Sequence, residues 1–402
     1  MQDTKTRQQI QSEALLDLKR LKVQNEAVEA WYTLPTRRGT VEAITGVGKN
    51  FMFIQCLHRL AEGIKVLFLA EQIDREFDVM QDIKKYDKIF DTDTHKNYDI
   101  TFMTYQSAYK LKDTEWHFVC ADEIHDSLSP AYSQFYFNNY YDYLLGLSAT
   151  IIRSTKYEEN GVEYTKGDLL DQIAPVCYRY TIDDGQRDGT SRKLSINVIP
   201  IELDRINKNV LAGNKTKQFY TTELESYQYW DKEFKKALFI QDEVKKLLKI
   251  RITSAARAKV LYRLPTKIQK IKKLLSTLKG KTLIFGNDLD TLLAITPNVV
   301  CSRYSDDKNK EIRSEFESGK INVIGSFKKL KQGANLSNLD NIIIMSYYST
   351  TKDLIQRLGR LRIDGNKVGN VYIFVTKNTQ EEVWFNKMFE EVNSLEIKKI
   401  EI

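Results

Sequence analysis

Residues 43–50, with the sequence AITGVGKN, combine small residues and a lysine in a spacing that suits phosphate binding. Glycines let backbone N–H groups approach phosphate oxygens closely, and the N-terminus of the following helix adds a favourable dipole. A lysine at this place can reach the β- and γ-phosphates of a nucleotide. A plain glycine-rich turn is the alternative. The residues that we predict to bind phosphate are Thr45, Gly46, Val47, Gly48 and Lys49.

Two positions in this segment depart from the usual pattern G-x-x-x-x-G-K-[ST]. Ala43 stands where the first glycine would be, and Asn50 stands where a hydroxyl would bind Mg²⁺. An amide oxygen can replace that hydroxyl, but Mg²⁺ requires small oxygen ligands in near-ideal octahedral geometry. We therefore expect Asn50 to contribute to nucleotide and metal binding.

Two adjacent carboxylates follow an apolar run in residues 118–125, FVCADEIH. Mg²⁺ takes one or two carboxylates together with phosphate oxygens and water. We expect Asp122 to hold Mg²⁺, and we expect Glu123 to orient and deprotonate the attacking water. When the segment is read alone, a solvated acidic turn at a strand end explains it better.

Two shorter motifs follow further along the chain. Residues 147–150, LSAT, come directly after an apolar run, and a plain strand end is a strong alternative. Residues 356–362, QRLGRLR, put three arginines on one short helical segment. Arginine carries a fixed charge and a bidentate fork, which suit a developing phosphoryl charge. The arginines of this segment are therefore candidate catalytic residues, and a solvated basic helix is the alternative.

Apolar runs that alternate with helical patterns position these motifs. In the first region we predict a helix over 8–31, a helix from about Lys49, and strands over 40–44, 65–69, 100–103, 118–121 and 144–147. In the second region we predict strands over 282–285, 299–302, 322–326, 341–346 and 370–375. Helices are expected there near 288–295, 308–318 and 352–361 and from about Thr379. Alternation of this kind indicates an α/β fold with parallel sheets.

The predicted domains are a first α/β lobe over 1–155, a connection over 156–278 and a second α/β lobe over 279–402. Residues 151–208 read as strands, turns and loops. Residues 216–278 read as charged helices, with Pro265 starting one of them. Between Asp231 and Lys281 the chain has 16 basic and 4 acidic residues, although the whole chain carries only +7. This surplus suits a nucleic-acid backbone about as well as it suits a solvated surface.

Composition excludes several classes of protein. The chain has 42% hydrophobic residues, 6 prolines and 18 glycines, which fits a globular protein with real cores. Its uninterrupted apolar runs are too short for a membrane span, and the N-terminus lacks the apolar core of a signal peptide. The four cysteines and four histidines are scattered without metal-ligand spacing. We therefore expect a protein of the reducing cytoplasm without a membrane partner.

The order of the motifs is their most specific property. A phosphate loop, Asp-Glu-x-His, Ser-Ala-Thr and Gln-Arg-x-Gly-Arg follow one another across two α/β regions. The chain thereby resembles the superfamily 2 helicases and translocases of the DEAD/DEAH-like kind. Within them it looks most like phage branch-migration helicases and the related restriction-enzyme and XPB-type motors. The resemblance covers most of residues 20–376.

The resemblance implies a fold, ligands and further site residues. It implies two RecA-like lobes joined by a basic helical segment, with ATP and Mg²⁺ as ligands. It adds Gln24 as an adenine contact and residues 330–336, with Gly333, as the motif before the arginine block. Gln356 would contact nucleotide, and either Arg360 or Arg362 would be the arginine finger. His125 would couple the ATP site to the second lobe.

The function that this resemblance implies is an ATP-dependent motor, most simply a DNA helicase or branch-migration translocase. It would bind DNA through backbone contacts, act in a bacterial or phage-infected cytoplasm, and could work as a monomer. Two alternatives stay open: an RNA helicase or transcript-release motor, and a nucleic-acid-binding module with a weak ATPase, which Asn50 suggests.

Overall fold

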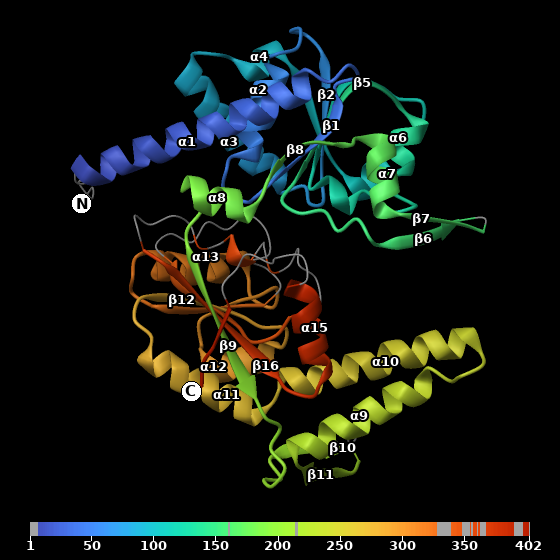
Figure 1. Cartoon of the computed structure of the whole chain (residues 1–402), viewed down its shortest axis with the longest axis vertical. Helices are drawn as coiled ribbons and strands as arrows, with labels where there is room; N and C mark the ends of the chain where they lie inside the picture. The colour runs from blue at the N-terminus through green and yellow to red at the C-terminus, as the bar shows by residue number, and fades with distance from the viewer. Residues whose placement is uncertain are drawn as a thin grey trace. The chain divides into compact units, whose positions relative to one another are not determined.

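The computed structural model describes residues 7–159, 161–213, 216–327, 339–347, 354, 357–359, 361, 367–389 and 397–401. The chain forms two compact units, Met1–Arg192 and Lys193–Ile402. Each unit has its own parallel sheet, and each is described below by itself (Figure 1). Among the described residues, none of the helices combines the length and apolar character that a membrane span requires.

The sheet of the first unit has six strands in the order β3-β2-β4-β5-β1-β8, and every pair is parallel. The strands are β1 (Arg38–Ala43), β2 (Lys65–Ala70), β3 (Asp99–Thr104), β4 (Glu115–Asp122), β5 (Tyr140–Ser148) and β8 (Val176–Tyr180). Because the strands are parallel, their carboxyl ends lie at one edge of the sheet. The ends of β1, β4 and β5 are neighbours there.

Helices cover both faces of this sheet, which explains why residues 66–70 of β2 and 118–121 of β4 are continuous apolar runs. Val66 and Phe68 of β2 pack into one core cluster, whereas Leu67 and Leu69 pack into another. The first cluster includes residues of α1 (Arg7–Tyr32), α2 (Lys49–Leu57) and α3 (Arg75–Phe90). The second includes residues of α6 (Gln134–Asn138) and α7 (Lys166–Ile173), on the other side of the sheet in Figure 1.

The remaining elements of the first unit are short. They are α4 (Thr94–Asn97), α5 (Tyr105–Ala108), the 3₁₀ turn η1 (Ile124–Asp126), α8 (Ile182–Asp188) and a hairpin of β6 (Lys156–Glu159) and β7 (Val162–Thr165).

The sheet of the second unit has the strand order β13-β14-β12-β15-β16-β9-β17, again with every pair parallel. The strands are β9 (Leu194–Ile201), β12 (Lys281–Phe285), β13 (Val299–Val300), β14 (Val323–Ser326), β15 (Leu339–Ile344), β16 (Gly369–Thr376) and β17 (Ile397–Lys399). Among the helices that accompany it are α11 (Pro265–Thr277), α12 (Leu289–Ile295), α13 (Asp306–Glu317) and α15 (Gln380–Phe389).

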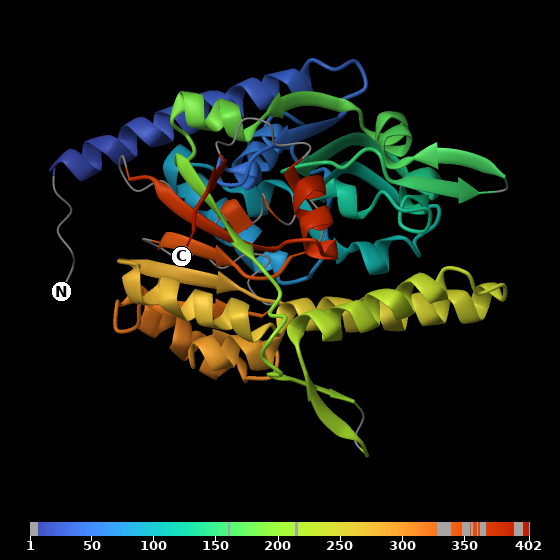
Figure 2. The same cartoon turned by 60° about the horizontal axis from the view of Figure 1, so that its bottom comes forward.

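Two antiparallel elements extend from this second unit. The helices α9 (Glu223–Ala237) and α10 (Glu243–Tyr262) pack against each other and project beyond the sheet (Figure 2). A hairpin of β10 (Val210–Gly213) and β11 (Gln218–Thr221) precedes them. Nine of the 16 basic residues between Asp231 and Lys281 lie on α9 and α10.

A buried ion pair ties two helices of the second unit together. The ammonium group of Lys267 on α11 lies 2.7 Å from the Glu381 carboxylate on α15, and neither side chain is exposed. The carbonyl oxygens of Leu261 and Met345 also accept hydrogen bonds from Lys267. Thr376 donates to Glu381 through both its hydroxyl and its backbone N–H. Both charges therefore have partners, which a buried charge requires.

Most predicted elements are present, with shifts of a few residues at their ends. Helix α2 begins at Lys49 and α11 begins at Pro265, as expected. Residues 166–173 and 182–188 are helices in a segment that we expected to hold strands, turns and loops. The region treated as a connection over 156–278 contributes β8 to the first sheet and β9 to the second. The helix expected at 352–361 lies largely outside the described residues.

Candidate nucleotide-binding site

The loop between β1 and α2 depends on two glycines with positive φ. Gly46 has φ of 95°, and Gly48, which precedes the first turn of α2, has φ of 91°. Other residues rarely adopt such angles. A Cβ atom on Gly48 would also lie 2.5 Å from the side-chain nitrogen of Gln24. The loop is therefore tight, and it brings its backbone to the N-terminus of α2, as a phosphate site requires.

Gln24, predicted as an adenine contact, lies against this loop. Its Nε2 atom donates a 2.8 Å hydrogen bond to the carbonyl oxygen of Val47, and its Oε1 atom accepts one from Gln55. The residue is buried, and α1 carries it. The structure thus joins Gln24 to the loop, and its contact with adenine stays a prediction.

Lys49 connects the loop to the acidic motif. Its ammonium group donates to the carbonyl oxygen of Ala43 at 3.2 Å and lies 3.8 Å from Oε1 of Glu123. Both side chains are mostly buried. Phosphate oxygens of a nucleotide bound to the loop would replace these two contacts of Lys49.

Glu123 holds a strained backbone conformation, with φ of 53° and ψ of 50°. Such angles are uncommon for a residue other than glycine, asparagine or aspartate, and they gather at functional sites. Its carboxylate accepts hydrogen bonds from the backbone N–H of Ala149 at 3.4 Å and from the hydroxyl of Ser148 at 3.5 Å. The Asp-Glu and Ser-Ala-Thr motifs are therefore in direct contact.

His125 belongs to the same network. Its Nδ1 atom lies 2.7 Å from the hydroxyl of Ser148 and 3.4 Å from Glu123, and the side chain is buried. Nε2 lies 3.4 Å from Asp126. The predicted role of His125 as a coupler to the second lobe stays a prediction, because these contacts all lie within the first unit.

The parallel sheet explains why these motifs meet. Asp122 pairs in register with Leu147, and Glu42 of β1 pairs with Ser148. The residues after β1, β4 and β5 thus leave the sheet at one edge, where ligands bind in open α/β proteins. Residues more than a hundred positions apart become neighbours there.

Arg75 is a site residue that the sequence analysis missed. Its Nε atom donates to Oδ2 of Asp122 at 2.9 Å, and its Nη2 atom donates to Oδ1 of Asn50 at 3.2 Å. Its Nη1 atom lies 3.1 Å from Asp78. The amide nitrogen of Asn50 donates to Asp82 at 2.7 Å. The two residues predicted to hold Mg²⁺ therefore share one guanidinium group.

The electrostatics of this cluster follow from burial and pairing. Burial raises the pKa of Asp122, and the Arg75 guanidinium opposes that rise. Burial likewise works against the charge on Arg75, but Asp122 and Asp78 together hold its pKa above the usual value. Arg75 therefore stays charged and stabilises the ionised form of Asp122.

The donors fit a cation. Oxygens of Asp122 and Asn50 both accept hydrogen bonds from one edge of the Arg75 guanidinium, so this place already accommodates a positive charge. In the described part of the chain, no cluster of three or more His, Cys, Asp or Glu side chains could hold a metal ion. Mg²⁺ at this site would therefore rely on phosphate oxygens and water, which is its usual coordination in nucleotide-hydrolysing enzymes.

Four predicted site residues, Gly333, Gln356, Arg360 and Arg362, lie outside the described residues. Arg357 in the same block is described. It is buried, donates to the carbonyl oxygen of Ser346 at 2.8 Å, and has its guanidinium 5.1 Å from the centre of the Phe285 ring. Arg357 therefore has a structural role in the second unit.

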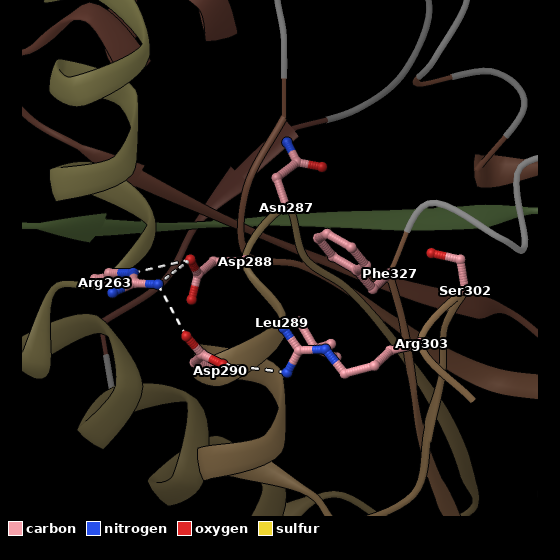
Figure 3. Close-up of a pocket in the computed structure, with 8 residues that line it drawn as sticks. All are labelled: Arg263, Asn287, Asp288, Leu289, Asp290, Ser302, Arg303 and Phe327. Atoms are coloured by element: carbon pink, nitrogen blue, oxygen red, sulfur yellow. Dashed lines mark hydrogen bonds and ion pairs between the residues drawn. The ribbon is translucent and has the colours of Figure 1, made fainter.

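A cavity of about 350 Å³ lies in the second unit at the carboxyl ends of β12, β13 and β14. Figure 3 shows the Arg263 guanidinium between Asp288 and Asp290, with Arg303 reaching toward Asp290. Two arginines and two aspartates balance the charge of its lining. None of the predicted site residues that the structure describes lines this cavity.

Several basic side chains between Asp231 and Lys281 form ion pairs within the second unit. Lys267 is fully buried, and Arg257 is buried with Asp231 at 2.7 Å. Lys245 and Lys246 pair with acidic residues one turn earlier on exposed surface. Exposed apolar side chains accompany them, and they are Tyr229, Phe239, Val244, Leu247, Leu248 and Ile252.

Comparisons with known proteins agree with this geometry. Residues 17–153 match the family model of the type III restriction enzyme res subunit, and residues 266–365 match that of the helicase conserved C-terminal domain. The DNA 3'-5' translocase XPB2 of Sulfurisphaera tokodaii is 24% identical over 375 residues, which are 89% of this chain and 82% of that protein.

Solved structures share the fold at low identity. The helicase domain of Pyrococcus furiosus Hef has a TM-score of 0.54 at 13% identity, covering 91% of this chain and 96% of its own. The restriction-modification enzyme LlaBIII, solved with DNA, has a TM-score of 0.62 at 12% identity. This chain covers 31% of LlaBIII and matches it over 94% of its own length. Dbp5 of S. cerevisiae, solved with RNA and ADP BeF3, has a TM-score of 0.55 at 12% identity.

A parallel α/β sheet with a glycine-rich loop and a lysine after β1 is the arrangement of a P-loop nucleotide-binding protein, and the same chain contains a second unit with a parallel sheet. The two family models together cover more than half of the chain. The chain belongs to the superfamily 2 helicases and translocases, and within them it is related to restriction-enzyme and XPB-type motors.

Proposed function

We propose that this chain is an ATP-dependent motor that moves along DNA. One observation carries the proposal. Lys49 of the phosphate loop lies 3.8 Å from Glu123, and Glu123 in turn contacts Ser148 and Ala149. The proposed phosphate-binding lysine, the proposed general base and the Ser-Ala-Thr motif are thus in contact within one unit. A simple glycine-rich turn would not need this arrangement.

In the proposed reaction the loop and Lys49 bind the β- and γ-phosphates of ATP. Glu123 accepts a proton from the attacking water, and its strained backbone holds the carboxylate at the strand end. Asp122 and Asn50 would hold Mg²⁺, which supplies charge neutralisation for the phosphates when it is bound. Loss of the γ-phosphate then alters the contacts of Glu123 with Ser148 and Ala149, which are a route for coupling to movement.

The arginine block of the second unit would complete the reaction. Arg360 or Arg362 would stabilise the charge that develops on the transferred phosphoryl group. Arg357 donates a hydrogen bond to the main chain of the second unit at Ser346, so the other two arginines of the block are the candidates. The predicted contacts of Gln356 and Gly333 with nucleotide belong to the same proposal.

DNA is the proposed track for two reasons. The translocase that the chain resembles over 89% of its length is named as a DNA translocase. The α9–α10 pair exposes Lys249 and apolar side chains, which suit phosphate contact and base stacking. Branch migration in a bacterial or phage-infected cell is the more specific form of this proposal, and a monomer would suffice for it.

A translocation assay tests the proposal. The full chain should displace a third strand from a DNA triplex with Mg²⁺ and ATP, and it should fail on a matched RNA track. A preference for RNA would favour an RNA helicase or transcript-release motor. ATP-dependent movement on neither track would contradict the proposal.

A second candidate is a nucleic-acid-binding module with a weak ATPase, and the contacts of Asn50 favour it. Both polar atoms of its amide are engaged by Arg75 and Asp82. Asn50→Thr distinguishes the two functions. If the amide weakens metal binding, the variant should need less Mg²⁺ for half-maximal ATPase. An unchanged or higher Mg²⁺ midpoint would mean that Asn50 is no handicap.

A further inference from the structure

We propose that Arg75 competes with the divalent metal for Asp122 and Asn50, so that loading of the metal–nucleotide complex requires Arg75 to move away. The proposal rests on the proposed function, because it assigns a positioning role at the same site. It makes Arg75 an internal cation that occupies the metal-binding oxygens between catalytic cycles.

The geometry of the guanidinium carries the inference. Nε and Nη2 lie on one edge of the planar group, and they donate to Asp122 and Asn50 at 2.9 and 3.2 Å. Nη1 lies on another edge and donates to Asp78 at 3.1 Å. The edge that meets the two predicted metal ligands is therefore separate from the edge that meets Asp78.

A metal ion and this guanidinium would not share the two ligands. A divalent ion that bound Asp122 and Asn50 would lie within a few ångströms of a fixed positive charge. Like charges at that separation repel strongly in a partly buried site. Lys49 already contributes one ammonium group nearby. The approach of a metal therefore favours release of Arg75 from Asp122.

Asp78 gives the released arginine a place to go. It lies one turn along α3 from Arg75, and its side chain is 39% exposed. Arg75 is the first residue of α3, where the backbone is least constrained. Asp82 holds the amide nitrogen of Asn50, so Oδ1 keeps its direction when Arg75 leaves. The first turns of α3 thus provide an alternative partner for Arg75 and an anchor for Asn50.

Two substitutions give opposite expectations. Arg75→Gln removes the competing charge and should lower the free Mg²⁺ concentration needed for half-maximal nucleotide binding, by about ten- to a hundredfold, the range that corresponds to hydrogen bonds to charged groups. Asp78→Asn removes the alternative partner, so Arg75 relies more on Asp122. This variant should raise the Mg²⁺ midpoint several-fold. A merely structural role of Arg75 predicts that both variants weaken binding.

The measurement is binding of a fluorescent ADP to the full chain over a range of free Mg²⁺. Bound Mn²⁺, measured by electron paramagnetic resonance, gives a second readout that does not depend on hydrolysis. Arg59→Gln is the matched control, because Arg59 pairs with Glu29 in the same unit away from the loop. Its Mg²⁺ midpoint should equal that of the wild type.

Loss of Arg75 leaves the buried Asp122 less compensated, so circular dichroism must accompany the assay. If Arg75→Gln does not fold, Arg75→Lys replaces it. A single ammonium group cannot span both ligands as the fork does, so the midpoint should still fall, by a smaller factor. The proposal would be overturned if the Arg75 variant that folds has a Mg²⁺ midpoint within twofold of the wild type, or a higher midpoint. Failure of the wild-type chain to bind nucleotide at any Mg²⁺ concentration would instead contradict the proposed function.

Discussion

Glu123 combines a strained backbone with a carboxylate that faces the phosphate-loop lysine. Strain of this kind costs about 1–3 kcal/mol and persists where the surrounding structure holds the residue in place. Here residues 118–122 at the end of β4 are buried, and Ser148 and Ala149 hold the carboxylate. At the scale of single residues, the position of the Glu123 carboxylate therefore depends on its backbone conformation and on its contacts with Ser148 and Ala149.

Glu123→Gln should preserve nucleotide binding and stop hydrolysis. The amide keeps the shape of the side chain but cannot accept the proton of water, and loss of a general base costs about 10²–10⁴-fold in rate. Single-turnover hydrolysis and nucleotide affinity, measured on the same protein, separate the two effects. Glu115→Gln, at the exposed start of the same strand, is the control. Hydrolysis within twofold of the wild type would exclude Glu123 as the base.

The residues predicted from sequence and those seen in the structure differ in one instructive way. Lys49, Asp122 and Glu123 were predictable because each belongs to a motif of fixed spacing. Arg75 was not predictable, because it lies in no such motif. It follows β2, and β2 pairs with β4 in the sheet, so the ends of these strands bring Arg75 to Asp122. Strand order sets this contact, and a single sequence does not reveal strand order.

At the scale of elements, the buried strands were predictable and the connections were less so. Residues 66–70 of β2 are a continuous apolar run because helices cover both faces of its sheet. Helices α7 and α8 were missed, although each begins with a capping box, Thr165 with Asp168 and Thr181 with Asp184. This local signal was available in the sequence. The place of β9 in the second sheet depends on pairing with β16, far along the chain.

The buried pair of Lys267 and Glu381 should be sensitive to loss of one partner. Lys267→Met leaves an uncompensated buried charge and should lower the unfolding free energy of the second unit by about 3–5 kcal/mol. Hydrogen exchange of the amides in β15 and β16 measures that change. The double variant with Glu381→Leu should recover much of it. Lys377→Met, which breaks an exposed pair with Glu202, should cost less than about 1 kcal/mol. Equal effects of Lys267→Met and Lys377→Met would contradict this account.

The α9–α10 pair gives a prediction about DNA binding. Lys245 and Lys246 form exposed pairs with neighbours on the same helix, and such pairs are weak enough to exchange for phosphates. Changing Lys245, Lys246 and Lys249 to Glu should lower affinity for single-stranded DNA. It should also reduce the slope of affinity against salt by about one unit per lost contact.

Fluorescence anisotropy at several salt concentrations measures both quantities. The change of Lys308 and Lys310 to Glu on α13 is the control, because both lysines are exposed in the same unit. If the triple variant binds DNA with the affinity and salt dependence of the wild type, the DNA-binding surface does not include these three lysines.

At the scale of the whole molecule, the proposed chemistry is divided between two units. The first unit contains the phosphate loop, the carboxylates and Arg75, whereas the predicted arginine finger belongs to the second. ATP hydrolysis should therefore need the full chain. Contact with DNA should stimulate it, because both units of such a motor bind the strand and the nucleotide.

Steady-state ATP hydrolysis with and without single-stranded DNA tests the central claim most directly. The full wild-type chain should hydrolyse ATP, and DNA should raise the rate several-fold. Lys49→Ala should lower the rate by about 10²–10³-fold, because it removes a charge-assisted contact to phosphate. Lys84→Ala, on the exposed side of α3, should leave the rate unchanged. Hydrolysis by Lys49→Ala at the rate of the wild-type chain would contradict the account. So would a wild-type chain that, with DNA present, hydrolyses ATP no faster than the background.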